Sequence, residues 1–526
     1  MADKKSPKVH KILLVATEAQ PYVSVGGAGS VIGHLSGALT GLGYEVAVFI
    51  PKFGLIDEQK YPMKMAMEGL AVPTDDAINP ELVCNVKYYE NGSGVKIFFL
   101  ENQEYFEKRA NVYGYSDDPT RFLLLSRGAL EFVRRGGFVP DVIHCNDWHA
   151  ASIPFYIKTL YKNDPVLKNI SSLLTIHNLA YQGIFDHRHV SEMNFDDGKS
   201  VIGSIFSDRV NTLNYMRRGI IFADAVNTVS RTYSKEILTP EFGEGLDKLL
   251  SELKGKLFGI VNGIDYDEFD PATDKLLHKN FDVNNIELRS ENKKALQKEF
   301  DLPVSSEKMV FAFVGRLDFM KGVDLLTTVM HHVLKEYDVQ FVEVGAGDWS
   351  LTERLNNLKN EFPTQVGIHP YPNFTLPRLV FGGADCILYP SRFEPCGIVQ
   401  IEAMRYGAIP IVRNVGGLAD TVENFDTIKQ TGTGFLFNEF DEFSLFGKII
   451  RAAELYKNAK LWRSLQTNAM RADYSWEFSA REYSKLYETT KNFHENPHRS
   501  FSALEGGING CDPRGTLKFL MLWAGV

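Results

Sequence analysis

The sequence is poor in cysteine, and its few cysteines lack the spacing of a metal site. Five cysteines are scattered over 526 residues with no C-x-x-C pair, at Cys84, Cys145, Cys386, Cys396 and Cys511. An odd, scattered set is typical of reduced thiols in a cytoplasm. We therefore expect a cytoplasmic protein without a disulfide framework or a cysteine-ligated metal.

Long apolar runs and an excess of positive charge are lacking as well. No run reaches the ~18 apolar residues of a membrane-spanning helix. The basic start, "MADKKSPKVHKILLVA", has an apolar run only as long as a strand and lacks a signal-peptide cleavage pattern. A formal net charge of −9 argues against general nucleic-acid binding, because such a surface must offset phosphate charge. We expect no membrane and no nucleic-acid partner; the oligomeric state is left open.

The chain does contain short apolar runs that alternate with longer amphipathic segments. Runs such as "KILLVAT" and "EVAVFI" in the first half, and "MVFAFVGRL" and "VQFVEVGAG" in the second, are typical of buried strands. Such strands alternating with helices predict parallel sheets covered on both faces. Because single cores stop growing near ~250–300 residues, the length indicates two domains. The expected fold class is α/β, with two doubly wound, Rossmann-like domains.

A turn-rich, acidic segment, "GIVNGIDYDEFDPATDK", predicts where the domains divide. We expect an N-terminal domain over residues 9–262 and a C-terminal domain over 263–475. Residues 476–495 are predicted to form a final helix that returns to the first domain, and residues 496–526 a poorly ordered tail. Ligands of open parallel sheets bind beyond the carboxyl ends of the strands, so the site is expected in a cleft between the domains.

The glycine-rich stretch "SVGGAGS", residues 24–30, contains no lysine or arginine. It lies between a strand-like run and a helix-like run, where backbone amides can approach a phosphate closely. Gly26 and Gly27 are the candidate donors there. Positive charge for such a ligand must come from elsewhere.

Two cations follow a strand of the second half, in "FVGRLDFMKG". Arg316 and Lys321 at such a turn are typical of an anion clamp, although two solvated charges at a helix start would look the same. Farther on, "YPSRFEPCGIVQIEAM" contains Glu394 and Glu402 in an E-x7-E spacing. Glu402 taken alone could be an ordinary helix-surface acid, whereas Glu394 stands in a strand-to-helix loop.

Long colinear motifs resemble those of one known family. They include "HCNDWHA", "TIHNLAYQG", "FGIVNGIDYDEFDPATD", "GGADCILYPSRFEPCG" and "EAMRYGAIPIVRNVGGLADTV", and they extend from about residue 11 to residue 490. In these motifs the sequence resembles the bacterial glycogen and starch synthases, which are retaining glucosyltransferases of the two-domain GT-B architecture. The resemblance implies glucose transfer from a nucleoside-diphosphate glucose, ADP-glucose foremost, to the non-reducing end of an α-1,4-glucan. It also implies that no metal or other cofactor is needed.

The resemblance implies roles for four catalytic residues. Arg316 and Lys321 match the cations that stabilise the leaving diphosphate. Glu394 matches the essential glutamate beside the glucose, and His177 matches a histidine near the 6-hydroxyl. Fixed donors aimed at developing charge are commonly the largest catalytic term, and losing one costs ~2.7–4 kcal/mol.

Further residues are expected around the donor on the same grounds. They stand at strand ends or in the turns that follow, at Ser24, Gly26, Gly27, Asp147, Asn262, Cys396, Gly397, Ile398 and Glu402. The amides of Gly397 and Ile398 are predicted at a helix start, and Asn262 is expected to shape the hinge. For Cys396, a small buried residue is the simpler interpretation than a redox role.

Two further assignments concern the nucleobase and a metal. Tyr371 and Phe374 are the nearest candidates for stacking on the base. Asp265 and Asp267 have the D-x-D spacing by which other glycosyltransferases hold a metal, but they lie in the expected interdomain turn. We predict that they bind none.

The glycine-rich stretch departs from the family's pattern, K-x-G-G-L, because Ser24 replaces the lysine that contacts donor phosphates. The departure implies weaker donor affinity, a changed preference among ADP-, UDP- and GDP-glucose, or an impaired enzyme. All four catalytic residues are present, which favours an active synthase. The alternatives are a related transferase with a small sugar acceptor and a catalytically silent glucan-binding protein.

Overall fold

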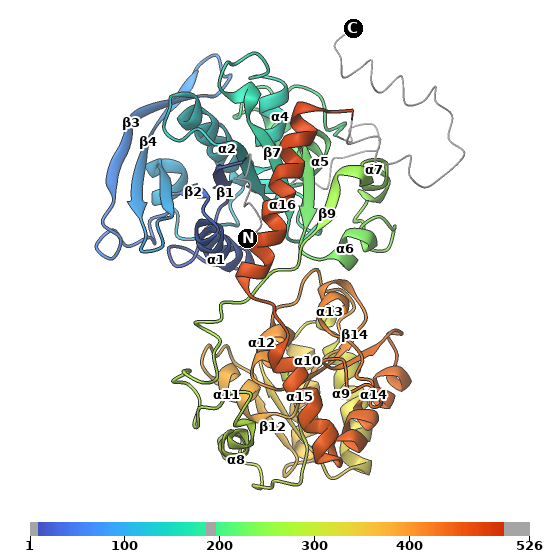
Figure 1. Cartoon of the computed structure of the whole chain (residues 1–526). Coiled ribbons are helices and arrows are strands. Elements are labelled where there is room, and N and C mark those ends of the chain that lie inside the picture. Colours follow the sequence, from blue (N-terminus) through green and yellow to red (C-terminus); the bar gives the residue numbers. More distant parts are fainter. Residues whose placement is uncertain (1–8, 186–195, 499–526) are drawn as a thin grey trace, which may run out of the picture.

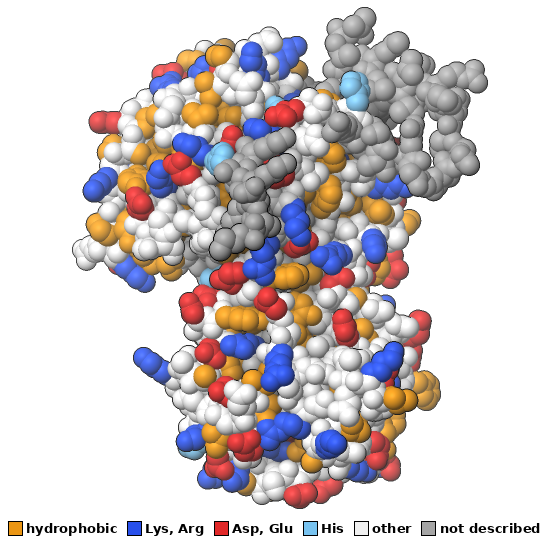
Figure 2. Space-filling view, viewed as in Figure 1, with side chains coloured by type: hydrophobic (Ala, Val, Ile, Leu, Met, Phe, Trp, Pro, Cys, Tyr) orange, Lys and Arg blue, Asp and Glu red, His pale blue; other side chains and the backbone are white. Residues whose placement is uncertain are grey.

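The computed structural model describes residues 9–185 and 196–498, which form two α/β domains joined at a narrow waist (Figure 1). The predicted tail lies almost wholly outside the described residues. Acidic and basic side chains are interspersed over both domains on the face drawn in Figure 2. Within the described ranges, no helix is both long and apolar enough to cross a membrane.

The first domain is built on a nine-stranded sheet with the order β3-β4-β5-β2-β1-β6-β7-β8-β9. Its strands are β1 (Lys11–Val15), β2 (Glu45–Pro51), β3 (Lys64–Pro73), β4 (Glu81–Glu90), β5 (Lys96–Glu101), β6 (Val142–Asn146), β7 (Ser171–Ile176), β8 (Ala225–Thr228) and β9 (Leu257–Gly259). In the order of the sheet, the seven strands β5, β2, β1, β6, β7, β8 and β9 run parallel, as expected. β3 and β4 add an antiparallel extension at one edge that the sequence analysis did not predict.

The second domain has a six-stranded, wholly parallel sheet with the order β12-β11-β10-β13-β14-β15. Its strands are β10 (Val310–Val314), β11 (Gln340–Val344), β12 (Val366–His369), β13 (Cys386–Tyr389), β14 (Ile409–Arg413) and β15 (Phe435–Phe437). β10 and β11 are buried at every position, because helices cover both faces of the sheet. The predicted pair of doubly wound parallel-sheet domains is confirmed.

Helices lie in the connections between the strands, except in the described stretches that join β2, β3, β4 and β5. Those of the first domain are α1 (Gly27–Gly41), α2 (Asp118–Arg134), α3 (Asp147–Ala150), α4 (Ser152–Lys158), α5 (Tyr215–Phe222), α6 (Arg231–Glu236) and α7 (Asp247–Glu252). The later helices are α8 (Arg289–Glu299), α9 (Val323–Glu336), α10 (Trp349–Glu361), α11 (Leu376–Gly383), α12 (Val399–Arg405), α13 (Gly416–Thr421), α14 (Glu442–Tyr456), α15 (Ala459–Arg471) and α16 (Trp476–Glu495).

The last helix, α16, crosses back and lies along the first domain (red in Figure 1). Tyr483 and Tyr487 of α16 are fully buried in the core of that domain. The two connections between the domains run side by side, since the Ile264 amide donates to the Tyr474 carbonyl over 2.9 Å. Gly263 packs so tightly there that a Cβ would lie 2.6 Å from the Trp476 nitrogen.

Candidate active site

A cavity of about 820 Å³ is lined by residues of both domains, at the carboxyl ends of their strands. The first domain contributes the turns after β1, β6 and β7 together with the start of α1. The second contributes the turns after β10 and β13. This is where open parallel sheets bind their ligands.

Two cations from the turn after β10 line the cavity, and each contacts a carboxylate. Arg316 is 69% exposed, and its Nε donates to Asp318 Oδ2 over 2.6 Å. Lys321 Nζ donates to Glu394 Oε2 over 2.5 Å. Asp318 also accepts the Lys321 backbone N–H through Oδ1, at 2.8 Å. A single carboxylate therefore orients both members of the cation pair.

The turn after β13 brings Glu394 to the cavity, where this residue is 8% exposed. Gly397 has a left-handed φ of 70°, which turns the chain into α12 and places Ile398 beside it on the cavity wall. Cys396 is buried, and desolvation raises the pKa of its thiol to about 12. The thiol is therefore protonated at neutral pH, which argues for packing over redox chemistry.

The turns after β6 and β7 bring Asp147 and His177 together on the opposite wall. The His177 backbone N–H donates to Asp147 Oδ1 over 2.8 Å. His177 Nε2 lies 3.0 Å from Oδ1 of Asn146, whose Nδ2 already donates to two carbonyls. Nε2 is therefore assigned the proton, and Nδ1 is left as an acceptor. Burial raises the pKa of Asp147, which has a left-handed φ of 54°.

The glycine-rich stretch opens α1, but two of its amides are already bound. Oε2 of buried Glu18 accepts the N–H groups of Val25 and Gly26, the latter over 3.0 Å. The amide of Gly27 comes next, in the first turn of α1, where no side chain caps the helix. Gly27 rather than Gly26 is thus the better candidate donor to a phosphate. Tyr113 supports the arrangement by donating its hydroxyl to Glu18 Oε1 over 2.5 Å.

Most of the predicted residues line this one cavity, but two do not. Those present are Glu394, Arg316, Lys321, His177, Gly26, Gly27, Asp147, Asn262, Cys396, Gly397 and Ile398. Ser24 lies outside the lining, with its Oγ donating to the Gly26 carbonyl. Glu402 also lies outside it, partly buried on α12, where desolvation raises the pKa of its carboxyl to about 7.

Other sequence candidates also lie away from the cavity. Tyr371 and Phe374 are exposed in the turn after β12. Asp265 lies 3.4 Å from His34 Nε2 in the interdomain connection, and its neighbour Asp267 is likewise outside the lining. The sequence analysis missed Glu18 and Asp318. Their signal was an acid placed just after a strand, beside a glycine-rich turn or a cation pair.

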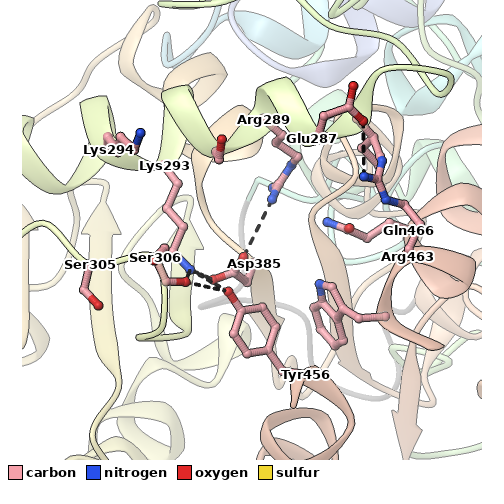
Figure 3. A pocket seen from close by; sticks show the side chains of 13 residues that line it. Glu287, Arg289, Lys293, Lys294, Ser305, Ser306, Asp385, Tyr456, Arg463 and Gln466 are labelled. Atoms are coloured by element: carbon pink, nitrogen blue, oxygen red, sulfur yellow. Dashed lines mark hydrogen bonds and ion pairs between the residues drawn. The ribbon is translucent and has the colours of Figure 1, made fainter. Parts of the chain in front are cut away.

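A second, smaller cavity of about 180 Å³ lies in the second domain, beside α8 (Figure 3). Lys293 and Arg289 both point at Asp385, with Lys293 Nζ 2.7 Å and Arg289 Nη1 3.8 Å from its oxygens. Arg463 pairs with Glu287 over 3.2 Å. These cations are neutralised locally, so the interdomain cavity is the better candidate for an anionic ligand.

Comparisons with known proteins agree with this geometry. Residues 11–252 match the family described as starch synthase catalytic domain, and residues 296–469 match glycosyl transferases group 1. A glycogen synthase of Thermotoga maritima is 38% identical over 489 residues, covering 91% of this chain and 98% of that protein. One of Streptococcus sanguinis is 40% identical over 486 residues, covering 91% and 99%.

Solved structures give the same result. The catalytic domain of starch synthase IV from Arabidopsis thaliana, bound to ADP and acarbose, matches with a TM-score of 0.78 and 29% identity. The match covers 92% of this chain and 99% of that one. Sucrose-phosphate synthase from Thermosynechococcus elongatus has a TM-score of 0.54 at 19% identity over 91% and 98% of the two chains, a likeness of fold alone.

Proposed function

Because the chain belongs to the glycogen and starch synthase family, we propose that it transfers glucose from ADP-glucose to the non-reducing end of an α-1,4-glucan, with retention of configuration. One observation carries the proposal. The interdomain cavity of about 820 Å³ has Arg316, Lys321 and Glu394 on one wall and His177 on the other.

In this proposal the cation pair binds the donor's diphosphate. Arg316 and Lys321 exchange their present carboxylate partners for phosphate oxygens as the donor enters. The uncapped first turn of α1 faces the same cavity and adds backbone N–H groups. Since negative charge grows on the diphosphate as it leaves, these donors stabilise the transition state more than the ground state.

The sugar lies between Glu394 and His177. Nδ1 of His177 accepts a hydrogen bond from a glucose hydroxyl, because Nε2 is held by Asn146. Lys321 leaves Glu394 for the diphosphate, and the freed carboxylate then supports positive charge that develops on the glucose. Asp147 positions His177 by accepting a hydrogen bond from its backbone N–H.

The cations supply the positive charge that a metal would otherwise provide, so we propose that the reaction needs no metal or other cofactor. The expectation of a cytoplasmic location stays a prediction. The donor base also belongs to the proposal: the starch synthase relative binds ADP, but Ser24 replaces the family's lysine in this chain.

The experiment is transfer of labelled glucose to glycogen from ADP-, UDP- and GDP-glucose, run in parallel with Ser24→Lys. Long labelled glucan formed best from ADP-glucose supports the proposal. A single disaccharide product would favour a transferase with a small acceptor. Glycogen binding without turnover from any donor would favour a silent glucan-binding protein. Activity that appears only with Ser24→Lys would mean that this chain has lost an essential phosphate contact.

A further inference from the structure

Helices α6 and α13 face each other where the two domains meet (Figure 1). Each supplies an acid to the other's amino end. Asp420 of α13 accepts the Thr232 N–H over 2.9 Å and the Thr232 O–H over 2.7 Å. Glu236 of α6 accepts the Gly416 N–H with both oxygens, at 3.0 and 3.2 Å. The contacts are reciprocal, so the two helices run antiparallel. We call this pair of contacts the α6–α13 clamp.

The α13 side of the clamp is built directly onto the turn that carries Glu394. The Gly417 N–H donates to the Glu394 carbonyl over 3.2 Å. A Cβ on Gly416 would lie 1.8 Å from the Glu394 carbonyl oxygen, and one on Gly417 would lie 1.9 Å from the Cys396 carbonyl oxygen. Only glycine permits so close an approach, so a shift of α13 must move the Glu394 turn with it.

The α6 side of the clamp reaches the turn that carries His177. The Tyr233 ring of α6 packs edge-on against Phe393, with ring centroids 5.5 Å apart. Phe393 directly precedes Glu394 in the chain. The Tyr233 hydroxyl accepts the Leu179 N–H over 3.2 Å, two residues beyond His177. Packed side chains therefore connect the sugar-facing residues of the two domains through α6.

We propose that Glu236 and Asp420 are positioning residues for glucosyl transfer. The α6–α13 clamp fixes the position of Glu394 in one domain relative to His177 in the other. Neither acid lines the interdomain cavity of about 820 Å³, so both are assigned to positioning rather than to the reacting groups. The inference rests on the proposed function. It predicts a larger effect on turnover than on donor affinity, since the clamp positions the turns of Glu394 and His177 and contacts neither cation of the pair.

The test compares Glu236→Ala, Asp420→Ala and the double variant with the unaltered protein, using ADP-glucose and glycogen. Each single variant should lower kcat about tenfold, equivalent to about 1.4 kcal/mol of transition-state stabilisation. The KM for ADP-glucose and the dissociation constant of ADP should change less than about threefold. Because both contacts belong to one clamp, the double variant should lose much less than the product of the single losses.

Conservative and control variants separate positioning from general destabilisation. Glu236→Gln and Asp420→Asn keep an acceptor for the helix amides and should retain most of kcat. Thr232→Val removes only the hydroxyl contact and should give an intermediate loss. Glu241→Ala removes an exposed carboxylate five residues along the chain from Glu236 and should leave kcat unchanged. Thermal melting identifies any variant that has unfolded.

Small-angle scattering gives a readout that does not depend on turnover. The alanine variants should be more expanded than the unaltered protein at saturating ADP. A kcat within twofold of the unaltered value in both alanine variants would overturn the inference, as would ADP affinity that falls in step with kcat. If the unaltered protein transfers no glucose, the proposed function fails, and scattering alone decides on the clamp: unchanged curves for the alanine variants overturn it.

Discussion

Lys321 is the residue on which the proposed chemistry depends most, because its ammonium contacts the Glu394 carboxylate from the neighbouring strand end of the second domain. Within the described residues its ammonium faces the cavity from the turn after β10, while Glu394 arrives from the turn after β13. A nearly buried carboxylate needs a partner while the donor is absent, and a departing diphosphate needs a cation when it is present. One side chain serves both needs.

Replacing this cation tests the role directly. Lys321→Ala should lower kcat about 10²–10³-fold, because a fixed donor to the developing charge is lost. Lys321→Arg keeps the charge with a different geometry and should lose less. Steady-state glucose transfer measures both, with circular dichroism as the control for folding. Near-normal turnover of the alanine variant would remove Lys321 from the mechanism.

Glu343 is the residue with the clearest pH signature. It is fully buried on β11, and neither carboxylate oxygen has a hydrogen-bond partner among the described residues. Desolvation raises the pKa of this carboxyl to about 9 from a usual value of 4.5. The folded protein therefore binds a proton more tightly than the unfolded chain does.

Stability should consequently fall as pH rises between those two values. Each pH unit in that window costs up to about 1.4 kcal/mol from this one group, and the loss ends above the folded-state pKa. Glu343→Gln cannot titrate, so its free energy of unfolding should depend less steeply on pH. Urea unfolding at pH 5, 7 and 8.5 measures the difference. Parallel pH profiles for the two proteins would show that Glu343 stays ionised.

At the scale of elements, the glycine-rich stretch is held by the strand before it. Glu18 follows β1 and accepts two N–H groups of the loop. The N–H groups of the first turn of α1 therefore remain available to a ligand in the cavity. A loop of glycines without such an acceptor would lose more conformational entropy when it orders around a phosphate.

Removing this acceptor should therefore weaken donor binding more than it slows chemistry. Glu18→Ala is expected to raise the KM for ADP-glucose about tenfold with a smaller change in kcat. Tyr113→Phe, which removes one supporting hydroxyl, should act in the same direction but less. Isothermal titration with ADP checks the affinity independently of turnover. Unchanged ADP affinity in Glu18→Ala would mean that the loop needs no support.

At the scale of the whole molecule, the proposed reaction needs both domains to contact the donor at once. The cation pair belongs to one domain and His177 to the other. The chain crosses between the domains twice, and the two crossing segments lie side by side near Ile264 and Tyr474. Ligands that touch both domains favour the closed arrangement, because only that arrangement satisfies both sets of contacts.

ADP should therefore compact the molecule. Small-angle scattering at saturating ADP is expected to give a smaller radius of gyration than without ligand. Lys321→Ala should reduce the compaction at equal ADP concentration, whereas a substitution in the remote cavity beside α8, such as Lys294→Ala, should not. Identical curves with and without ADP would contradict closure by this ligand.

The sequence by itself determined the fold class, the turns that carry polar residues and the family. These features depend on short-range pattern: apolar runs of strand length, glycines at strand ends, and motifs of a few residues such as "HNLAYQG". Residues at carboxyl ends of parallel strands meet at one edge, so Arg316, Lys321, Glu394 and His177 could be predicted to converge.

Only the tertiary structure decided which partners those residues have. Local pattern contains no information on the contact of Asp420 with Thr232 or on that of Glu236 with Gly416, 188 and 180 residues apart along the chain. Such contacts form when whole elements pack, and packing is set by the shape of surfaces that are distant in sequence. For the same reason Glu402, which has a plausible spacing from Glu394, lies outside the cavity on α12.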